Sequence, residues 1–219
     1  MERSTNIPAK SRKTTGRRAV AEETRQRLLV AGRRAFGAKG LGGANLREDI
    51  LKPAKVSTGS FYHQFQDKAD LLLEILRVDG ANVRAQIEKN ASSAGRNMVD
   101  AVHDAFAVYF DMADRSPDFV KIYIREYYSD DRRVRRVIRE HNESTIRNVS
   151  QILGRLNETA GLAVDTEIGG ILISSLTISI INYYLGLPVR QRAAMRERML
   201  SGTVKLFLGG VQAVRPEAQ

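Results

Sequence analysis

A run of hydrogen-bonding side chains surrounds two phenylalanines in the stretch VSTGSFYHQF, residues 56–65. Phe61 and Phe65 are four residues apart and therefore share one face of a helix. The opposite face is nearly uncharged and carries small or hydrogen-bonding residues: Thr58, Gly59, Ser60, Tyr62 and His63. A short helix with an aromatic inner face and a polar outer face suits the major groove of DNA. The stretch therefore predicts hydrogen bonding to base edges and phosphates.

A second short helix is expected just before this stretch. It runs from Leu46 to about Lys52. Asn45 is its N-cap, and Glu48 stands where it would complete a capping box. Pro53 stops the helix because proline lacks the amide hydrogen that a helix interior needs. Residues 54–56 then form a turn, and the whole arrangement is a helix-turn-helix.

Small polar residues also mark the starts of the next two helices. Ser57 or Thr58 can cap the helix that ends near Phe65, because a side-chain oxygen accepts from an otherwise unpaired backbone N–H. Asp67 holds the same position before a long helix that begins at Lys68 and extends into the 80s.

The chain before these helices is strongly basic. Residues 1–21 carry Lys and Arg among Ser, Thr and Gly, which predicts a disordered arm that follows a groove or phosphates, or that serves as a solubilising tail. A first helix is expected from Glu22 to about Lys39, and Gly40 ends it. Residues 1–89 hold 18 Lys and Arg against 10 Asp and Glu, whereas residues 90–219 hold 17 against 15. This distribution favours a partner that carries phosphates.

The remainder of the chain also has helical patterns and no convincing strand or internal repeat. Further helices are expected at about 97–114, 118–128, 131–158, 166–186 and 190–210. We therefore predict an all-α protein of about nine helices. Its parts are the arm, residues 1–21, a first domain, residues 22–72, and a second domain, residues 73–219.

Little in the sequence supports catalysis, a metal site or a cofactor. There is no Cys, which excludes disulfides and thiolate ligands. His103 and His141 lack a partner at metal-ligand spacing, and no phosphate loop, nucleophile elbow or carboxylate pair is present. We expect no enzyme, no metal and no cofactor. Residues 168–187 are uncharged and long enough to span a bilayer, but their Ser, Thr and Asn and the lack of a secretory signal favour a cytoplasmic protein with no membrane partner.

Residues 24–72 resemble the DNA-binding domain of the TetR family of one-component transcriptional regulators. The string Val-Ser-x-Gly-x-Phe-Tyr-x-x-Phe-x-x-Lys, residues 56–68, is quite specific to that family. Three residues depart from the family pattern: Leu51 replaces a small residue, Lys55 replaces the turn glycine, and Pro53 is a local oddity. A Lys with positive φ is unfavourable, so we expect a slightly altered turn.

The resemblance implies that the third helix enters the major groove of an operator. The DNA-contacting residues that it implies are Asn45, Arg47, Ser57, Thr58, Gly59, Ser60, Tyr62, His63 and Lys68. Thr58, Ser60 and His63 are the better candidates for reading bases. Tyr62 and Lys68 would hold phosphates, Lys68 at a helix N-terminus. The alternative is that Tyr62 and His63 are ordinary surface residues of a core-forming helix.

Aromatic residues gather in the middle helices, where the resemblance implies an effector pocket. The candidate lining residues are Phe106, Tyr109, Phe110, Phe119, Ile122, Tyr123 and Tyr127. If they face inward, they would line a cavity for a small apolar or aromatic effector. The alternative is that they pack closely with no space between them.

The last two helices are the expected dimer interface. In the family, the penultimate helix pairs with the last one across a two-fold axis to form a four-helix bundle. A helix that is apolar on nearly all sides, such as 168–187, suits such double burial. The candidate interface residues are Ile171, Ser175, Ile178, Asn182, Leu200, Val204 and Phe207.

Together these expectations describe a homodimeric, ligand-responsive transcriptional regulator. We expect a repressor that a small molecule releases from a palindromic operator of double-stranded DNA. The first alternative is an architectural DNA-binding protein without an effector. The second is an all-α enzyme, for which the sequence offers no acid–base pair.

Overall fold

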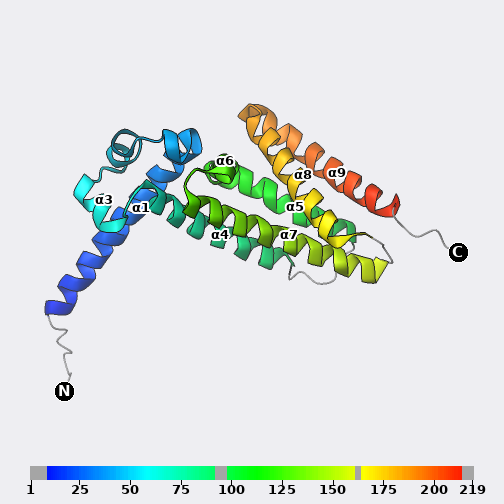
Figure 1. The fold of residues 1–219 in the computed structure, drawn as a ribbon, viewed down its shortest axis with the longest axis horizontal. Coiled ribbons are helices and arrows are strands. Elements are labelled where there is room, and N and C mark those ends of the chain that lie inside the picture. Colours follow the sequence, from blue (N-terminus) through cyan, green and yellow to red (C-terminus); the bar gives the residue numbers. More distant parts are fainter. Residues whose placement is uncertain (1–8, 92–97, 161–163, 214–219) are drawn as a thin grey trace, which may run out of the picture. The chain divides into compact units, whose positions relative to one another are not determined.

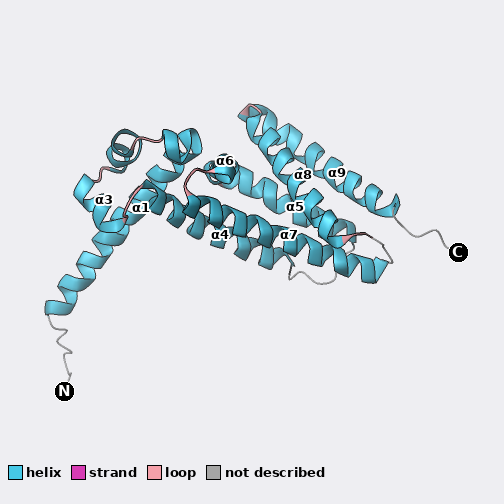
Figure 2. Ribbon diagram, in the orientation of Figure 1, coloured by secondary structure: helices cyan, strands magenta, loops and turns pink. Residues whose placement is uncertain are grey.

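The chain is all-α. The computed structural model describes residues 9–91, 98–160 and 164–213, and every regular element in these ranges is a helix (Figures 1 and 2). Nine of them are α-helices, which confirms the predicted fold class. The chain divides into two compact units, Met1–Ile75 and Leu76–Gln219. The division falls close to the boundary that we expected after residue 72, and the two units are described separately below.

The first helix of the N-terminal unit is longer than expected. Helix α1 spans Ala9–Gly43 instead of beginning at Glu22, so the predicted disordered arm is wrong for residues 9–21. Extending an existing helix needs no new nucleus, and Lys, Arg and Ala are good helix formers. The basic segment therefore extends the expected first helix toward the N-terminus. The remainder of the predicted arm, residues 1–8, lies outside the described residues. Gly40 interrupts α1 with a φ of 71°, near the end that we expected for the first helix.

The helix-turn-helix is formed by three short elements of this unit. A π-helix spans Leu46–Leu51, α2 spans Lys52–Ala54 and α3 spans Thr58–Gln64. Helix α4, Lys68–Ala91, begins in this unit. The core of the unit consists of fully buried apolar side chains from α1, the π-helix, α3 and the start of α4: Leu28, Leu29, Phe36, Ile50, Phe61, Leu71, Leu72 and Ile75.

The C-terminal unit contains the remaining helices, mostly within a few residues of their expected bounds. They are α5, Met98–Arg115; α6, Pro117–Arg125; a short 3-10 helix, Glu126–Tyr128; α7, Arg132–Ala160; α8, Thr166–Gly186; and α9, Val189–Ala213. Helices α8 and α9 form an antiparallel hairpin (Figure 1). Their apolar faces pack against α5 through a buried cluster that includes Phe106, Phe110, Tyr184, Leu200 and Val204.

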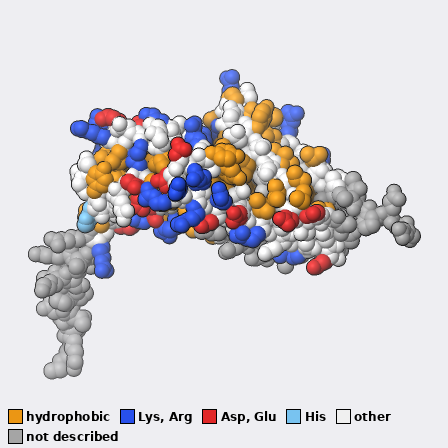
Figure 3. Space-filling view, in the orientation of Figure 1, with side chains coloured by type: hydrophobic (Ala, Val, Ile, Leu, Met, Phe, Trp, Pro, Cys, Tyr) orange, Lys and Arg blue, Asp and Glu red, His pale blue; other side chains and the backbone are white. Residues whose placement is uncertain are grey.

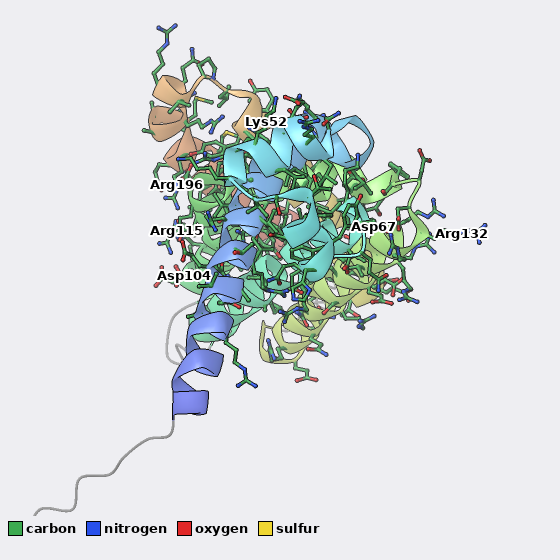
Figure 4. The ribbon with its side chains drawn as sticks, turned by 90° about the vertical axis from the view of Figure 1, so that its left-hand side faces the viewer. Lys52, Asp67, Asp104, Arg115, Arg132 and Arg196 are labelled. Carbon is green, nitrogen blue, oxygen red and sulfur yellow. The ribbon has the colours of Figure 1, made fainter. Side chains whose placement is uncertain are left out.

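Polar contacts tie α5 to this hairpin. The Tyr184 hydroxyl donates to an Asp114 carboxylate oxygen at 2.7 Å. Arg196, labelled in Figure 4, pairs with Asp111 and Asp114. Burial of Tyr184, together with its hydrogen bond to the Asp114 carboxylate, raises the pKa of this phenol to about 12. The phenol therefore stays neutral and keeps its donor role throughout the physiological range.

Helices α7 and α8 approach each other closely at a glycine. A Cβ added at Gly170 would lie 2.2 Å from Ser150 Oγ and 3.0 Å from the Ile146 carbonyl oxygen. Only a residue without a side chain fits this crossing without movement of the neighbouring helix. The contact fixes which residues of α8 face α7.

Candidate nucleic-acid interface and apolar cavity

Helix α3 begins at the cap that the sequence indicated. Ser57 is extended, and its Oγ accepts from the Ser60 N–H at 3.1 Å. The two hydroxyl oxygens, Ser57 Oγ and Ser60 Oγ, are also 2.9 Å apart. Ser57 therefore serves first as the N-cap, and the hydroxyl of Ser60 is already shared with it.

The two faces of α3 are divided as predicted. Phe61 and Phe65 are buried, with 0% and 3% of their surface exposed, and their ring centroids lie 5.8 Å apart. The outer residues are all exposed: Thr58, Gly59, Ser60, Tyr62 and His63. We call these five residues the reading face. Buried aromatics on one side hold the helix, and hydrogen-bonding groups on the other side remain open to a partner.

Lys55 makes the turn without a glycine. Its φ of 54° and ψ of 45° are left-handed, and it is the only residue besides glycine with a positive φ in the part of the chain that the structure describes. The Lys55 N–H donates to Lys52 O at 3.1 Å, and the Val56 N–H donates to Leu51 O at 3.1 Å. The turn is therefore closed by backbone hydrogen bonds, and Lys55 adopts the conformation that glycine would have supplied more easily.

The other two unusual residues also find places in this turn. Leu51 is buried, with 4% of its surface exposed, so its longer side chain joins the core. Pro53 lies in the first turn of α2, where proline is tolerated because that amide has no partner within the helix. Our expectation that Pro53 stops the helix is wrong by one residue, because α2 continues to Ala54.

The start of the π-helix is capped by Asn45, as expected, but the capping box differs. Asn45 Oδ1 accepts from the Glu48 N–H at 3.0 Å. The Asn45 N–H donates to Asp49 Oδ2 at 2.8 Å, so Asp49 takes the role that we assigned to Glu48. The wider π-helical turn places the reciprocal carboxylate one residue later. Glu48 instead pairs with the exposed Lys52, which is labelled in Figure 4.

Asp49 also anchors α1. Lys39 Nζ lies 2.6 Å from Asp49 Oδ1. The hydrogen bond from Lys39 and that from the Asn45 amide hold the pKa of Asp49 below its ordinary value of 3.8. Arg47, one of the residues expected to contact DNA, is exposed beside this carboxylate network.

Lys68 has a different role from the phosphate contact that we expected. Its Nζ donates to Leu41 O at 3.0 Å and to Ala44 O at 2.6 Å, and the residue is half-buried. Carbonyl oxygens at a helix end lack partners within the helix and carry partial negative charge, so they attract an ammonium group. The side chain of Lys68 thus fastens the start of α4 to the end of α1. The cap before it is as predicted, with Asp67 Oδ1 accepting from the Asp70 N–H at 2.7 Å.

An apolar cavity lies within the C-terminal unit, among residues of α4 to α8. Its volume is about 60 Å³, which is enough for a few water molecules. Three of the seven predicted residues line it: Tyr109, Phe119 and Tyr123. The structure therefore brings together part of the set that the sequence indicated.

The other four predicted residues lie elsewhere, and their assignment to the cavity is wrong. Phe106 packs against Phe207, with 6.0 Å between ring centroids, and Phe110 packs against Tyr184 at 5.2 Å. Ile122 is fully buried in the protein interior, and Tyr127 is exposed beside Tyr128. Aromatic content predicted the right helices, but only the rotation of each helix decides which ring faces the cavity.

Sequence reasoning missed the polar part of the lining. The cavity is bordered by five polar residues from α7 and α8: His141, Asn142, Thr145, Ser174 and Thr177. The signal was present in α8, where Ser174 and Thr177 are three residues apart in a largely apolar stretch. Such spacing places both side chains on one helical face.

Burial keeps the two phenols of the cavity neutral. Desolvation raises the pKa of Tyr109. It also raises the pKa of Tyr123, with smaller contributions from Tyr127 and Tyr109. The Tyr123 ring meets His141 edge to face, with 5.3 Å between centroids. The cavity thus combines apolar walls with uncharged hydroxyl groups.

The expected dimer residues fall into two groups. Ile171, Ser175 and Asn182 are exposed on α8, as an interface with a partner requires. Leu200 and Val204 are buried in the core of the protomer itself, so assigning them to a dimer interface is wrong. The reason is that α9 turns these residues toward α5. Two further residues also point inward: Ile178 lines the cavity, and Phe207 contacts Phe106.

Helix α8 nevertheless presents an apolar outer face. Its exposed large side chains are Ile168, Ile171, Leu172, Leu176 and Tyr183. Figure 3 shows hydrophobic side chains gathered over this part of the molecule. By length and composition α8 could cross a membrane, and only 33% of its most apolar window is buried. We call these five residues, together with Ser175 and Asn182, the outer face of α8.

Among the described residues, no group of three or more His, Asp or Glu could hold a metal ion. The chemistry that these two places offer is therefore hydrogen bonding on the reading face and contact with a small, mainly apolar molecule in the cavity.

The fold and the reading face define the class of protein as a helix-turn-helix protein. Residues 28–75 match the sequence model of the bacterial regulatory proteins of the tetR family. The N-terminal domain of the chain is therefore a DNA-binding domain of the tetR type. It is 37% identical over 76 residues to the HTH-type transcriptional regulator AcrR of Shigella flexneri. That match covers 34% of this chain and only 35% of the length of the Shigella protein.

Solved structures extend the similarity of fold to most of the chain. A transcriptional regulator from Rhodococcus sp. Rha1 has a TM-score of 0.68 at 18% identity, covering 85% of this chain and 96% of its own. A regulator of the TerR/AcrR family from Aquifex aeolicus VF5 has a TM-score of 0.64 at 23% identity, covering 84% and 99%. At such identities the likeness concerns the fold alone.

Proposed function

We propose that the chain is a homodimeric transcriptional repressor of the cytoplasm that a small apolar molecule releases from a palindromic DNA operator. The reading face carries this proposal, because it joins exposed hydrogen-bonding groups to a buried aromatic anchor inside a TetR-type domain. An architectural DNA-binding protein would need no ligand cavity, so the cavity in the C-terminal unit favours a ligand response.

In this proposal the residues of the helix-turn-helix have distinct roles. Thr58 and His63 read base edges in the major groove, with Ser60 contributing through the hydroxyl that it shares with Ser57. Tyr62 and Arg47 contact phosphates, which set the register of the helix on the duplex. Lys68 acts from the interior by fixing α4 to α1 and is not assigned a phosphate.

The outer face of α8 supplies the dimer contact in the proposal. Exposed apolar side chains at helical spacing suit the same face of a second copy, because a two-fold interface is self-complementary. Two copies of α3 would then meet two half-sites of a near-palindromic operator. A ligand that binds more tightly to the form with low DNA affinity would release the DNA.

The first test identifies the operator and measures its specificity. Selection of bound sequences from random duplexes should enrich a near-palindrome. Fluorescence anisotropy should then show binding to it at least a thousandfold tighter than to random DNA at the same salt concentration. Equal affinity for the selected and random duplexes would refute the proposal.

Single variants test the assigned roles. Arg47→Ala should weaken binding to all duplexes and reduce the salt slope by about one, as loss of one phosphate contact does. Arg139→Ala removes the same charge from an exposed position on α7 and serves as the control. Thr58→Val keeps the shape but removes the hydroxyl, so it should relax the preference at one base pair. Identical effects of Arg47→Ala and Arg139→Ala would contradict the placement of the interface.

A further inference from the structure

Among the described residues, one buried polar side-chain atom of the cavity lacks a hydrogen-bond partner. Ser174 is 4% exposed, and its Oγ makes no hydrogen bond within the described residues, although it lines the cavity. A buried hydroxyl without a partner is costly, and native proteins rarely leave one unexplained. A hydroxyl both donates and accepts, so a ligand oxygen could satisfy it in either role.

The two neighbouring threonines behave differently. Thr177 Oγ1 donates to Ile173 O at 2.7 Å, and Thr145 Oγ1 donates to His141 O at 3.1 Å. Each hydroxyl is therefore satisfied by the carbonyl one turn earlier in its own helix. Ser174 stands out because the same kind of bond to its own helix is absent.

The cavity has no carboxylate, ammonium or guanidinium group in its described lining to pair with an ion. None of the described residues that line it is Asp, Glu, Lys or Arg, and His141 is the one lining residue among them that can carry a positive charge. Burial raises the pKa values of the phenols of Tyr109 and Tyr123, which keeps both groups neutral. A charged ligand would lose its hydration here without an ion pair in return, and that loss is large. The lining therefore selects for neutral molecules.

The size and the walls of the cavity limit the shape of the ligand. The volume of about 60 Å³ is less than half of the roughly 150 Å³ that encloses a benzene ring, so a ring enters only if the flexible side chain of Met112 moves aside. Phe119, Tyr123 and Met112 supply flat or adaptable apolar surfaces around that space. A ring fills such a slot with little loss of conformational freedom.

We propose that the cavity binds a neutral molecule with one apolar ring and one hydroxyl or carbonyl oxygen, and that this oxygen forms a hydrogen bond with Ser174 Oγ. The inference rests on the proposed function only in taking the cavity as the effector site. It adds the chemical class of the effector and the residue that selects it.

Three ring compounds of similar size test the inference directly. Calorimetric titration of the purified full chain with phenol, toluene and benzoate compares a neutral oxygen, a methyl group and a carboxylate on the same ring. We expect phenol to bind about tenfold more tightly than toluene, as one satisfied hydrogen bond provides. Benzoate should bind more weakly than both.

Ser174→Ala should reduce the phenol-to-toluene ratio to about one while leaving toluene affinity unchanged. Ser201→Ala, the same change on α9 at a residue that does not line the cavity, is the matched control and should leave the ratio unchanged. The melting temperature of each variant checks folding, and Ser174→Ala should fold normally because it removes a group without a partner. Failure of all three compounds to bind, benzoate binding as tightly as phenol, or an unchanged ratio in Ser174→Ala would each overturn the inference.

The readouts separate this inference from the proposed function. Ring binding is measured without DNA, so phenol binding that leaves operator affinity unchanged would refute the ligand response but support the chemistry of the cavity. Release of the operator by benzoate but not by phenol would support the ligand response and overturn the inference.

Discussion

Replacing Lys55 by glycine should stabilise the helix-turn-helix. Lys55 has a φ of 54° in the turn before α3, a conformation that costs a residue with a Cβ about 1–2 kcal/mol. Glycine avoids that cost, but it also makes the unfolded chain more flexible, which lowers the free energy of unfolding by about 0.4–1 kcal/mol. The difference predicts a net gain of about 0.5–1 kcal/mol for Lys55→Gly.

Lys55→Ala is the matched variant, because alanine removes the same exposed charge but keeps the Cβ. It should therefore change stability by much less than Lys55→Gly does. The turn is otherwise held by the bonds from the Lys55 and Val56 amides to Lys52 O and Leu51 O, which neither variant removes.

Native-state hydrogen exchange of the full chain measures the effect locally. The amides of Val56 and Phe61, which donate to Leu51 O and Ser57 O, report on the turn and on α3. Both should exchange about two- to fivefold more slowly in Lys55→Gly. Equal protection in the glycine and alanine variants would show that the left-handed backbone carries no penalty here, and the reasoning would fail.

Three further predictions concern the two units. Gly170→Ala should lower the melting temperature, because the added Cβ meets Ser150 Oγ and a backbone oxygen, and such overpacking costs about 1–3 kcal/mol of stability. Gly154→Ala is the control: the space around its Cβ is open, so the higher helix propensity of alanine should raise the free energy of unfolding by up to about 1 kcal/mol. Ser57→Ala should lower the free energy of unfolding, measured by denaturant titration, by about 1 kcal/mol, because it removes the N-cap hydrogen bond of α3. Thr58→Ala should lower it by less, because Ser57 and not Thr58 caps the helix. Because the pKa of Asp49 is lowered in the folded state, its contribution to stability is present above about pH 4 and is lost as the pH falls through the folded-state pKa. In Asp49→Asn the free energy of unfolding should therefore fall less steeply as the pH is lowered below about 4. An unchanged pH dependence in this range would contradict the prediction.

Local sequence signals predicted the helix-turn-helix well, because its chemistry is local. The caps at Asn45, Ser57 and Asp67 depend on residues three positions apart, so their hydrogen bonds could be predicted from spacing alone. The role of Lys68 could not, since its partners are the carbonyls of Leu41 and Ala44, which only the folded chain brings near.

The cavity was harder to predict for the same reason. Rotation of α5 and α6 decides that Tyr109 and Phe119 face the cavity while Phe110 packs on Tyr184, and rotation depends on packing between helices distant in sequence. Leu200 and Val204 of α9 were assigned to a partner because their apolar spacing is the same whether they face another copy or α5. Periodicity identifies a buried face without naming what covers it.

Helix α8 is constrained along both of its sides. Ser174 and Thr177 line the cavity, whereas Leu172 and Leu176, on adjacent turns, belong to the exposed outer face. At Gly170 the approach of α7 also forbids any rotation that would exchange the two sides. If the cavity binds the proposed effector and the outer face forms the proposed dimer contact, few positions on α8 are free to vary, and adaptation to a new effector would come mainly from substitutions in α5, α6 and α7.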